Sequence, residues 1–232
     1  MEIAFPYLQV GSVRLVCPVD ISPADLILRH DQNAPHERTR GLHLSDIYKS
    51  ICVEMDRKRF DPDKPMDMVR IETGTAFEQV LEIGLVARHP GLVRPGEVAC
   101  DGIIGSPDGL LLVELAEILW RLLEYKATWM SSREGMGTIN PVTGEFVPHR
   151  KFWHWFVQIK GYLYMLNRVF GFGMTQVQLV VLFVNGDYSK GNGTGPQLLS
   201  WIYEFSEDDQ IRNWSMILKH AIRKGWLNAP TT

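Results

Sequence analysis

The stretch that most constrains this chain is residues 101–128, DGIIGSPDGLLLVELAEILWRLLEYKAT. A Ser-Pro-Asp-Gly turn precedes a long apolar run, which ends in Glu124, Tyr125 and Lys126. The pattern predicts a β-hairpin, and in a strand Glu124 and Lys126 point to the same face because they lie two residues apart. Hairpins usually carry their charges on a solvated face, but this run is too apolar to be half solvated. These charged groups therefore need an explanation other than solvation.

Helical and strand-like segments surround the hairpin. Residues 131–148 are rich in Gly, Pro, Ser and Thr and predict a mobile loop. The order of segments predicts an α/β or α+β domain with one mixed central sheet flanked by helices. The predicted helices are about 46–58 with Ser45 as N-cap, 74–88 opened by Thr73-Gly74, 149–168, and 206–224 opened by Ser206. The predicted strands are about 8–17, 97–104, 109–116, 118–127, 176–185 and 197–205.

Composition narrows the class of protein. The chain has 232 residues, of which 45% are hydrophobic and 22% charged, so we expect one globular domain with a substantial core. We divide it into an N-terminal extension of about 1–44, a core of about 45–205 and a C-terminal helix of about 206–225. The sequence has no window near 18 uninterrupted apolar residues and no basic start followed by an apolar run. We therefore expect neither a membrane span nor a signal peptide.

Cysteines and net charge add two further limits. The three cysteines are scattered without a CxxC pair, which argues against a disulfide framework or a structural zinc site and fits a reducing cytosol. The formal net charge of −3 gives no general reason to expect nucleic acid as a partner. If DNA is the partner, its basic binding surface must be local.

The hairpin predicts a site for chemistry at its near end. Asp108 and Glu124 are expected on adjacent strands, with Lys126 one pleat further on. Two converging carboxylates repel each other and raise a pKa unless a cation neutralises them, and Mg²⁺ or Mn²⁺ suits such oxygen ligands. Acid, acid and lysine around such a cation suit phosphodiester hydrolysis. Alternatively, Asp108 is a plain turn former and Glu124 a rim carboxylate paired to Lys126 or Arg121. The interval from Asp108 to Glu124 is long for a tight hairpin, so we expect a bulge or an extended turn.

Asp108 followed by Glu124-x-Lys126 resembles the PD-(D/E)xK nuclease superfamily, with SPDG and EYK as its second and third motifs. These two motifs are similar in sequence to those of lambda-type phage exonucleases and their RecB-like relatives. The resemblance spans about residues 38–185 and implies a restriction-endonuclease-like core. It implies hydrolysis of DNA with Mg²⁺ or Mn²⁺. The related iron–sulfur nucleases need four cysteines, so no iron–sulfur cluster is expected here.

The resemblance also assigns metal ligands. The stretch TGTAFEQVLE matches a helix that supplies an upstream acid, which falls on Glu78, with Glu82 one turn later as the rival. The metal ligands it implies are Asp108, Glu124 and the backbone carbonyl of Tyr125, with Glu78 nearby. An exposed helix glutamate is the alternative interpretation of Glu78.

Further catalytic and DNA-binding residues follow from the same resemblance. Lys126 is expected to orient the attacking water and to stabilise charge on the phosphate. HRKFWHWFVQIKGYLYMLN matches the helix after the hairpin, whose Gln-x-x-x-Tyr spacing falls on Gln158 and Tyr162. These two lie four apart and so share a helix face, where they are expected to touch substrate or the metal site. Polar positions on an amphipathic helix are the alternative.

A pocket for a 5′-phosphate is the last site that the resemblance implies. Arg38, Ser45 and Ser106 stand at the matching places, and a helix N-terminus with hydroxyls and a guanidinium is a good anion site. Arg40 is an equally suitable arginine, and Ser45 as a plain N-cap is the alternative.

These features favour a DNA exonuclease. The lambda-type resemblance implies digestion of one strand of linear duplex DNA from its 5′ end. It also implies a ring-shaped homo-oligomer that works with a single-strand annealing protein in phage-type recombination. The expected compartment is the cytoplasm, that of the host if the chain is phage-encoded. Two alternatives remain, namely a restriction-type endonuclease and a catalytically silent nuclease fold used for DNA binding or assembly.

Overall fold

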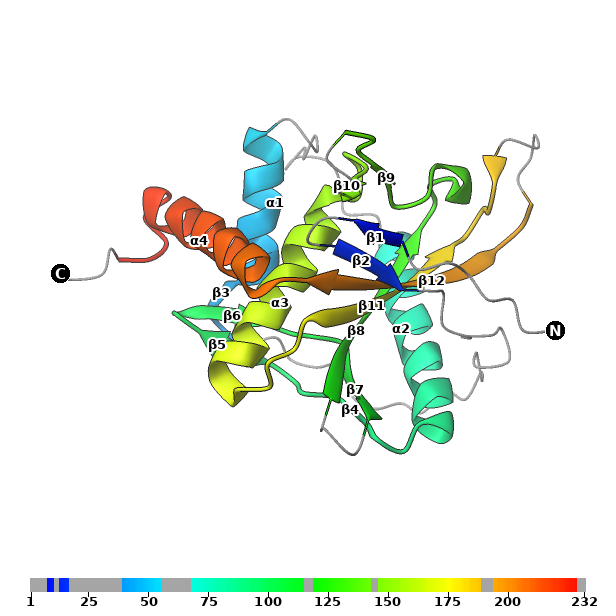
Figure 1. Cartoon of the computed structure of the whole chain (residues 1–232), viewed down its shortest axis with the longest axis horizontal. Coiled ribbons are helices and arrows are strands. Elements are labelled where there is room, and N and C mark those ends of the chain that lie inside the picture. Colours follow the sequence, from blue (N-terminus) through cyan, green and yellow to red (C-terminus); the bar gives the residue numbers. More distant parts are fainter. Residues whose placement is uncertain are drawn as a thin grey trace.

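The computed structural model describes residues 8–10, 13–16, 39–55, 68–114, 119–142, 146–188 and 194–228. Its main sheet is mixed, because β8 and β11 run parallel and the other neighbouring pairs run antiparallel. The predicted α/β architecture with a mixed central sheet is therefore confirmed. The order across this sheet is β1 (Leu8–Val10), β2 (Val13–Val16), β12 (Gln197–Phe205), β11 (Gln176–Phe183), β8 (Leu119–Thr128), β7 (Gly109–Glu114) and β4 (Leu92–Val93) (Figure 1).

Two smaller sheets accompany the main one. In the first, β3 (Leu42–His43) runs parallel to β6 (Ile103–Gly105), and β6 pairs antiparallel with β5 (Val98–Cys100). In the second, β9 (Gly137–Ile139) and β10 (Phe146–Pro148) form an antiparallel pair. The first sheet matters for the site, because β6 leads directly into the Ser-Pro-Asp-Gly turn.

Helices cover both faces of the main sheet (Figure 1). Since neighbouring residues of a strand point to opposite faces, β8 supplies two apolar clusters. Leu122 belongs to the large cluster with α1, α3 and α4, whereas Leu123 and Tyr125 pack in a smaller cluster with α2. The helices are α1 (Leu44–Glu54), α2 (Met68–Arg88), α3 (Trp153–Phe170) and α4 (Glu207–Arg223), and a 3₁₀ helix spans Ser132–Glu134.

Two glycines set how closely the elements around the site approach α3. A Cβ at Gly161 would lie 2.8 Å from Cδ2 of Leu44, so α1 packs directly on the backbone of α3. A Cβ at Gly105 would lie 2.9 Å from Cε1 of Tyr162. Real Cβ contacts are rarely so short, and the end of β6 therefore lies against α3 because Gly105 has no side chain.

Three predicted boundaries are wrong for local reasons. The single strand expected over 97–104 is two strands, because Asp101 and Gly102 form its turn with φ of 50° and 77°. Asp-Gly suits a two-residue hairpin whose central residues both have positive φ. Helix α2 begins at Met68, so Gly74 lies inside it. The loop expected over 131–148 holds the 3₁₀ helix, β9 and β10.

Of the two serines predicted as helix N-caps, one is confirmed and one is wrong. Helix α1 begins at Leu44 with His43 in the N-cap position, so the assignment of Ser45 as N-cap is wrong. Ser206 is the N-cap of α4 as predicted, and its hydroxyl accepts a hydrogen bond from the N–H of Asp209 at 3.2 Å. In the part of the chain that the structure describes, no helix is both long and apolar enough to cross a membrane.

Candidate active site

The β7–β8 hairpin places Asp108 beside Glu124. Gly109 pairs with Leu123, so Asp108, one residue before β7, comes opposite Glu124. The N–H of Tyr125 donates a hydrogen bond to Oδ2 of Asp108 at 2.7 Å, which holds this carboxylate against β8. The register of the hairpin shifts between Leu112 and Glu114, as expected from the long interval between the two acids.

Glu124 and Lys126 lie on one face of β8. The Glu124 side chain is 1% exposed and that of Lys126 is 17% exposed. The ammonium of Lys126 donates a hydrogen bond to Oε1 of Glu124. Oε2 of Glu124 is buried and has no hydrogen-bond partner in the described part of the chain. A buried oxygen without a partner is costly to the fold.

The electrostatics of the cluster follow from burial and from like charges. Burial and the Asp108 carboxylate raise the pKa of Glu124 to about 8, and burial also raises the pKa of Asp108. Burial alone would lower the pKa of Lys126, but the carboxylates of Glu124 and Asp108 outweigh it and raise this pKa. Lys126 is therefore a lasting positive charge beside two carboxyls that resist sharing the site as anions.

Glu78 rather than Glu82 joins this cluster. Burial and the Asp108 carboxylate raise the pKa of Glu78 to about 7, while the charge of Lys126 opposes the shift. Glu82 instead forms an ion pair with Arg94, whose Nη1 lies 2.7 Å from its Oε2. The Asp108 carboxylate therefore acts on Glu78, whereas Glu82 is held by Arg94.

Gln158 and Tyr162 face each other on α3. Nε2 of Gln158 donates a hydrogen bond to the hydroxyl of Tyr162 at 2.8 Å, as their spacing predicts. Both side chains are buried, and Oε1 of Gln158 has no partner within the described ranges. Burial and then the Glu124 carboxylate raise the pKa of Tyr162, which shows that this pair adjoins the acidic cluster. Tyr162 therefore lies in the interior beside the site rather than on an open surface.

Tyr125 contributes its backbone to the site. Its side chain points to the opposite face of β8, where it packs with Phe77, Leu81 and Leu85 of α2. This packing fixes the strand, and the Tyr125 N–H then fixes Asp108. The assignment of the Tyr125 backbone carbonyl as a metal ligand stays a prediction.

Of the three residues of the predicted 5′-phosphate pocket, the structure describes Ser45 and Ser106. Because β3 and β6 are parallel, the chain leaves both strands at the same edge, with Ser45 in the first turn of α1 and Ser106 in the exposed turn after β6. The structure therefore brings these two hydroxyl-bearing segments to one edge. Arg38 lies outside the described residues, whereas Arg40 is described and exposed.

Tyr48 is a neighbour of the cluster that sequence reasoning missed. It lies on α1 and is buried, and burial raises its pKa to about 12 with smaller effects from the charges of Lys126 and Glu124. The spacing of Leu44, Ile47, Tyr48 and Ile51 marks the buried face of α1. That signal predicts a buried Tyr48, but not which element its hydroxyl approaches.

The donor set fits a hard divalent cation. Among the described residues, no group of three or more His, Cys, Asp or Glu side chains converges as a metal centre. Mg²⁺ in proteins often binds through one or two carboxylates and keeps several waters. Asp108 and Glu124 supply two carboxylates, and the unpartnered Oε2 of Glu124 is an oxygen that a cation would satisfy. Their raised pKa values also fit a site where positive charge is missing.

A second constellation has the residue types of a hydrolytic triad but the wrong proton arrangement. His220 Nε2 lies 2.9 Å from Oγ of Ser50, and Nδ1 lies 3.7 Å from Oε2 of Glu54. Arg223, which has only donors, lies 2.9 Å from Nδ1, so Nδ1 accepts and Nε2 carries the proton toward Ser50. A general base needs Nε2 free to accept the serine proton. This group is therefore a structural link between α1 and α4.

Comparisons of the chain with protein-family models, with curated proteins and with solved structures each returned no match. The functional assignment rests on the sequence motifs and on the geometry described above.

Proposed function

We propose that the protein is a Mg²⁺- or Mn²⁺-dependent deoxyribonuclease of the PD-(D/E)xK type, built on a restriction-endonuclease-like core. The observation that carries the proposal is the meeting of Asp108, Glu124 and Lys126 at one end of the β7–β8 hairpin. The partnerless Oε2 of Glu124 and the electrostatic coupling of Glu78 to Asp108 support it.

Each residue has a distinct role in this proposal. Asp108 and Glu124, with the Tyr125 carbonyl and with Glu78 nearby, would hold the cation. A bound cation would supply Lewis-acid polarisation of the phosphate and a water of lowered pKa. Lys126 stays protonated, so it orients the attacking water and stabilises negative charge that develops on the phosphate.

Gln158 and Tyr162 act as positioning residues in the proposal. Their mutual hydrogen bond fixes both side chains beside the acidic cluster. The buried Oε1 of Gln158 then offers an acceptor toward the site, because it has no partner among the described residues. We assign Gln158 to the catalytic set, and the buried Tyr162 would contribute to nucleic-acid binding by holding Gln158 in place.

We further propose that the enzyme degrades linear duplex DNA from its 5′ ends, as lambda-type exonucleases do. The shared edge of Ser45 and Ser106 supports an anion pocket, because a helix N-terminus and two hydroxyls favour a phosphate. Arg38, or Arg40, would add the guanidinium. The ring-shaped homo-oligomer, the single-strand annealing partner and the cytoplasmic setting, that of the host for a phage-encoded chain, belong to this proposal on the resemblance alone.

The deciding experiment incubates linear and covalently closed circular duplex DNA with the protein and Mg²⁺. An exonuclease degrades the linear DNA and leaves the circle whole, whereas a restriction-type endonuclease opens the circle at a defined sequence. Lys126→Ala should abolish cleavage while DNA binding and folding persist, and Arg168→Ala at the exposed end of α3 is the matched control. Cleavage that survives Lys126→Ala would remove the assigned mechanism. A silent binding protein would bind DNA and cleave neither substrate.

The direction of digestion has its own test. Ends that carry a 5′-phosphate should be better substrates than 5′-hydroxyl ends, and Ser106→Ala should narrow that difference. Loss of the arginine in Arg38→Ala should cost about 2 kcal/mol, the size of a charge-assisted hydrogen bond. Equal rates on both kinds of end, or release of nucleotides from 3′ ends, would contradict the 5′-phosphate pocket and leave the cleavage chemistry intact.

A further inference from the structure

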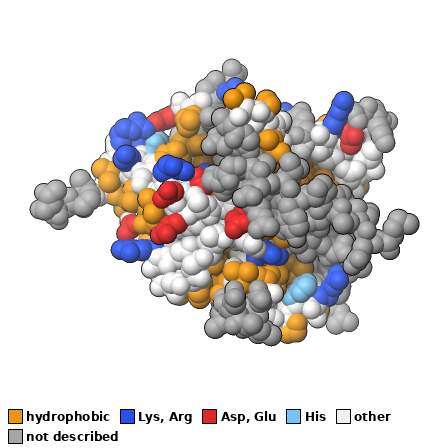
Figure 2. Space-filling view, viewed as in Figure 1, with side chains coloured by type: hydrophobic (Ala, Val, Ile, Leu, Met, Phe, Trp, Pro, Cys, Tyr) orange, Lys and Arg blue, Asp and Glu red, His pale blue; other side chains and the backbone are white. Residues whose placement is uncertain are grey.

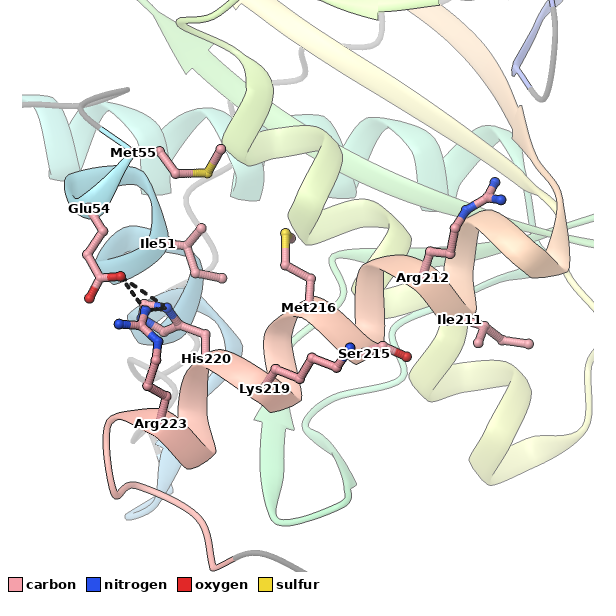
Figure 3. Close-up of a pocket in the computed structure, with 10 residues that line it drawn as sticks. All are labelled: Ile51, Glu54, Met55, Ile211, Arg212, Ser215, Met216, Lys219, His220 and Arg223. Atoms are coloured by element: carbon pink, nitrogen blue, oxygen red, sulfur yellow. Dashed lines mark hydrogen bonds and ion pairs between the residues drawn. The ribbon is translucent and has the colours of Figure 1, made fainter.

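A groove of about 660 Å³ lies between α1 and α4 and shares no lining residue with the candidate active site (Figure 3). Its apolar lining comes from both sides, with Ile51 on α1, Met55 directly after it, and Ile211 and Met216 on α4. In Figure 3, Ile51 and Met216 point into the space between the helices. The groove is therefore an apolar channel between two helices rather than a polar depression.

Large apolar side chains stand exposed in this groove. Met55 is 45% exposed and Ile211 is 43% exposed. These two lie at opposite ends of the groove with Ile51 and Met216 between them, and a continuous apolar surface with a polar rim marks an interaction site. Two of the four apolar residues are methionines, Met55 and Met216, whose flexible thioethers adapt to different apolar partners.

The rim of the groove is basic. Arg212, Lys219 and Arg223 line it, with Glu54 as the one lining carboxylate. Arg212 is paired to Asp209 and Arg223 to Glu54, so Lys219 is the lining cation for which no ion pair is seen in the described part of the chain. Figure 2 shows Lys and Arg side chains beside apolar ones over the part of the molecule where α4 lies.

One end of the groove is held rigid by ion pairs. Glu54 accepts from Arg223 at one carboxylate oxygen and from Lys224, 2.6 Å away, at the other. His220 adds a hydrogen bond to Ser50, which ties α4 to α1 a second time. Lys219 has no ion pair within the described ranges and therefore stays available to a partner. A wall fixed before binding lowers the cost of ordering a ligand.

We infer that the α1–α4 groove binds an acidic amphipathic helical segment of a partner protein. Its apolar side chains would cover the floor at Met55, Ile211 and Met216, and its carboxylates would meet Lys219. A helix that places an apolar face in such a groove is a recurring mode of peptide recognition. A DNA backbone fits less well, because surfaces that contact DNA are predominantly polar and would leave the apolar floor unused.

The test uses synthetic peptides, because the inference names a chemistry and not a protein. The first peptide has about 16 residues, enough to form a helix, with Leu at helical spacing on one face and Glu elsewhere. A scrambled peptide of the same composition and one with Lys for Glu are the comparison probes. Fluorescence anisotropy with the full chain should show the acidic amphipathic peptide binding at least tenfold more tightly than either.

Variants locate the binding. Ile211→Asp and Lys219→Glu should each weaken the peptide by about tenfold, which corresponds to 1.4 kcal/mol. Val169→Asp makes the same chemical change at an exposed position of α3 outside the groove and should leave binding unchanged. Cleavage of linear DNA by Ile211→Asp should match that of the wild type, so the inference stands or falls independently of the proposed nuclease activity. Thermal unfolding of each variant confirms that it is folded.

Three outcomes would overturn the inference. Equal binding of the ordered and scrambled peptides would show that charge alone acts. If duplex DNA binds instead of peptide and is lost in Ile211→Asp, the groove is a nucleic-acid surface. If neither the peptide nor DNA binds, and sedimentation shows that the wild type self-associates while Ile211→Asp is monomeric, the occupant is a second copy of this chain.

Discussion

The acidic cluster of β7–β8 and the ion-pair cluster that joins α1 to α4 contain the same residue types with opposite electrostatics. In the first, burial and neighbouring carboxyls raise the pKa of Glu124 to about 8. In the second, the hydrogen bonds from Arg223 and Lys224 lower the pKa of Glu54 to about 2. The difference arises because Glu54 meets two cations near solvent, whereas Glu124 shares one buried lysine with Asp108 and Glu78.

The two clusters have opposite effects on the stability of the fold. Every oxygen of Glu54 has a cationic partner, so the cluster links two helices and favours the fold. Glu124 keeps an oxygen without a partner among the described residues, so its cluster opposes the fold, and a cation at the proposed site would offset that cost. A cluster that weakens the protein is expected where binding or catalysis requires it.

The largest expected effect is on cleavage. Asp108→Asn keeps an oxygen that accepts the Tyr125 N–H but removes the charge, and it should slow degradation of linear DNA by about 10³-fold. Release of labelled nucleotides in Mg²⁺ measures the rate. Glu54→Gln and Glu82→Gln, which neutralise carboxylates outside the acidic cluster, should stay within about threefold of the wild type. An active Asp108→Asn enzyme would mean that this carboxylate is a turn former only.

A comparison of Glu78→Gln with Glu82→Gln tests which acid of α2 belongs to the candidate active site. Glu78 is coupled to Asp108, while Glu82 is paired to Arg94, so only the first change should lower the rate, by about 10–10² fold. The same DNA-degradation assay at saturating Mg²⁺ gives the ratio. If both variants are equally impaired, the two acids are not functionally distinct.

Metal binding should appear as stability that Asp108→Asn lacks. At a free Mn²⁺ or Mg²⁺ concentration one hundred times Kd, the wild type should gain about 2.7 kcal/mol, and EDTA should reverse the gain. Thermal unfolding with and without the ion measures it. Glu54→Gln should gain as much as the wild type because its site is elsewhere. An equal gain in Asp108→Asn would place the cation at other residues.

Without metal, removing the charge of one carboxylate should change the free energy of unfolding in opposite directions in the two clusters. In EDTA, Asp108→Asn should stabilise the protein by about 2 kcal/mol, because it removes a buried carboxylate that repels Glu124 and Glu78. Glu54→Gln should destabilise it, because Arg223 and Lys224 lose their anion. Urea unfolding of the three proteins compares the signs. Destabilisation by both changes would refute the contrast between the clusters.

The smallest effect is the acid dependence of the Glu54 cluster. The folded-state pKa of Glu54 is lowered from 4.5 to about 2, so its contribution to stability is fully present above about pH 4.5 and is lost as pH falls toward 2. The difference in urea midpoint between the wild type and Glu54→Gln should shrink over that window. Added salt should also reduce it, since the pairs are exposed. A difference that is constant with pH would exclude the ion pairs as its cause.

Much of the fold was predictable from periodicity. The alternation in β8 predicted Glu124 and Lys126 on one face, and the spacing in α3 predicted that Gln158 and Tyr162 meet. Ser206 was readable as an N-cap because its preference is local. Ser45 misled for the same reason: a good N-cap residue lies inside α1, where β3 ends at His43 and the helix begins at once. Asp101-Gly102 is a typical hairpin turn sequence, so the division of the predicted strand 97–104 into two strands was predictable and was missed.

The sequence by itself determined the order of elements, the apolar faces and the face-sharing of charged pairs, because these depend on residues a few positions apart. Tertiary structure alone decided that Glu78 is coupled electrostatically to Asp108 while Glu82 pairs with Arg94, and that Tyr48 borders the cluster. It also decided that Glu54 finds two cations from α4, more than 160 positions away in the sequence. These choices depend on which helix packs on which face of the sheet, and burial and the neighbouring charges then set each carboxyl's pKa, so no local pattern encodes them.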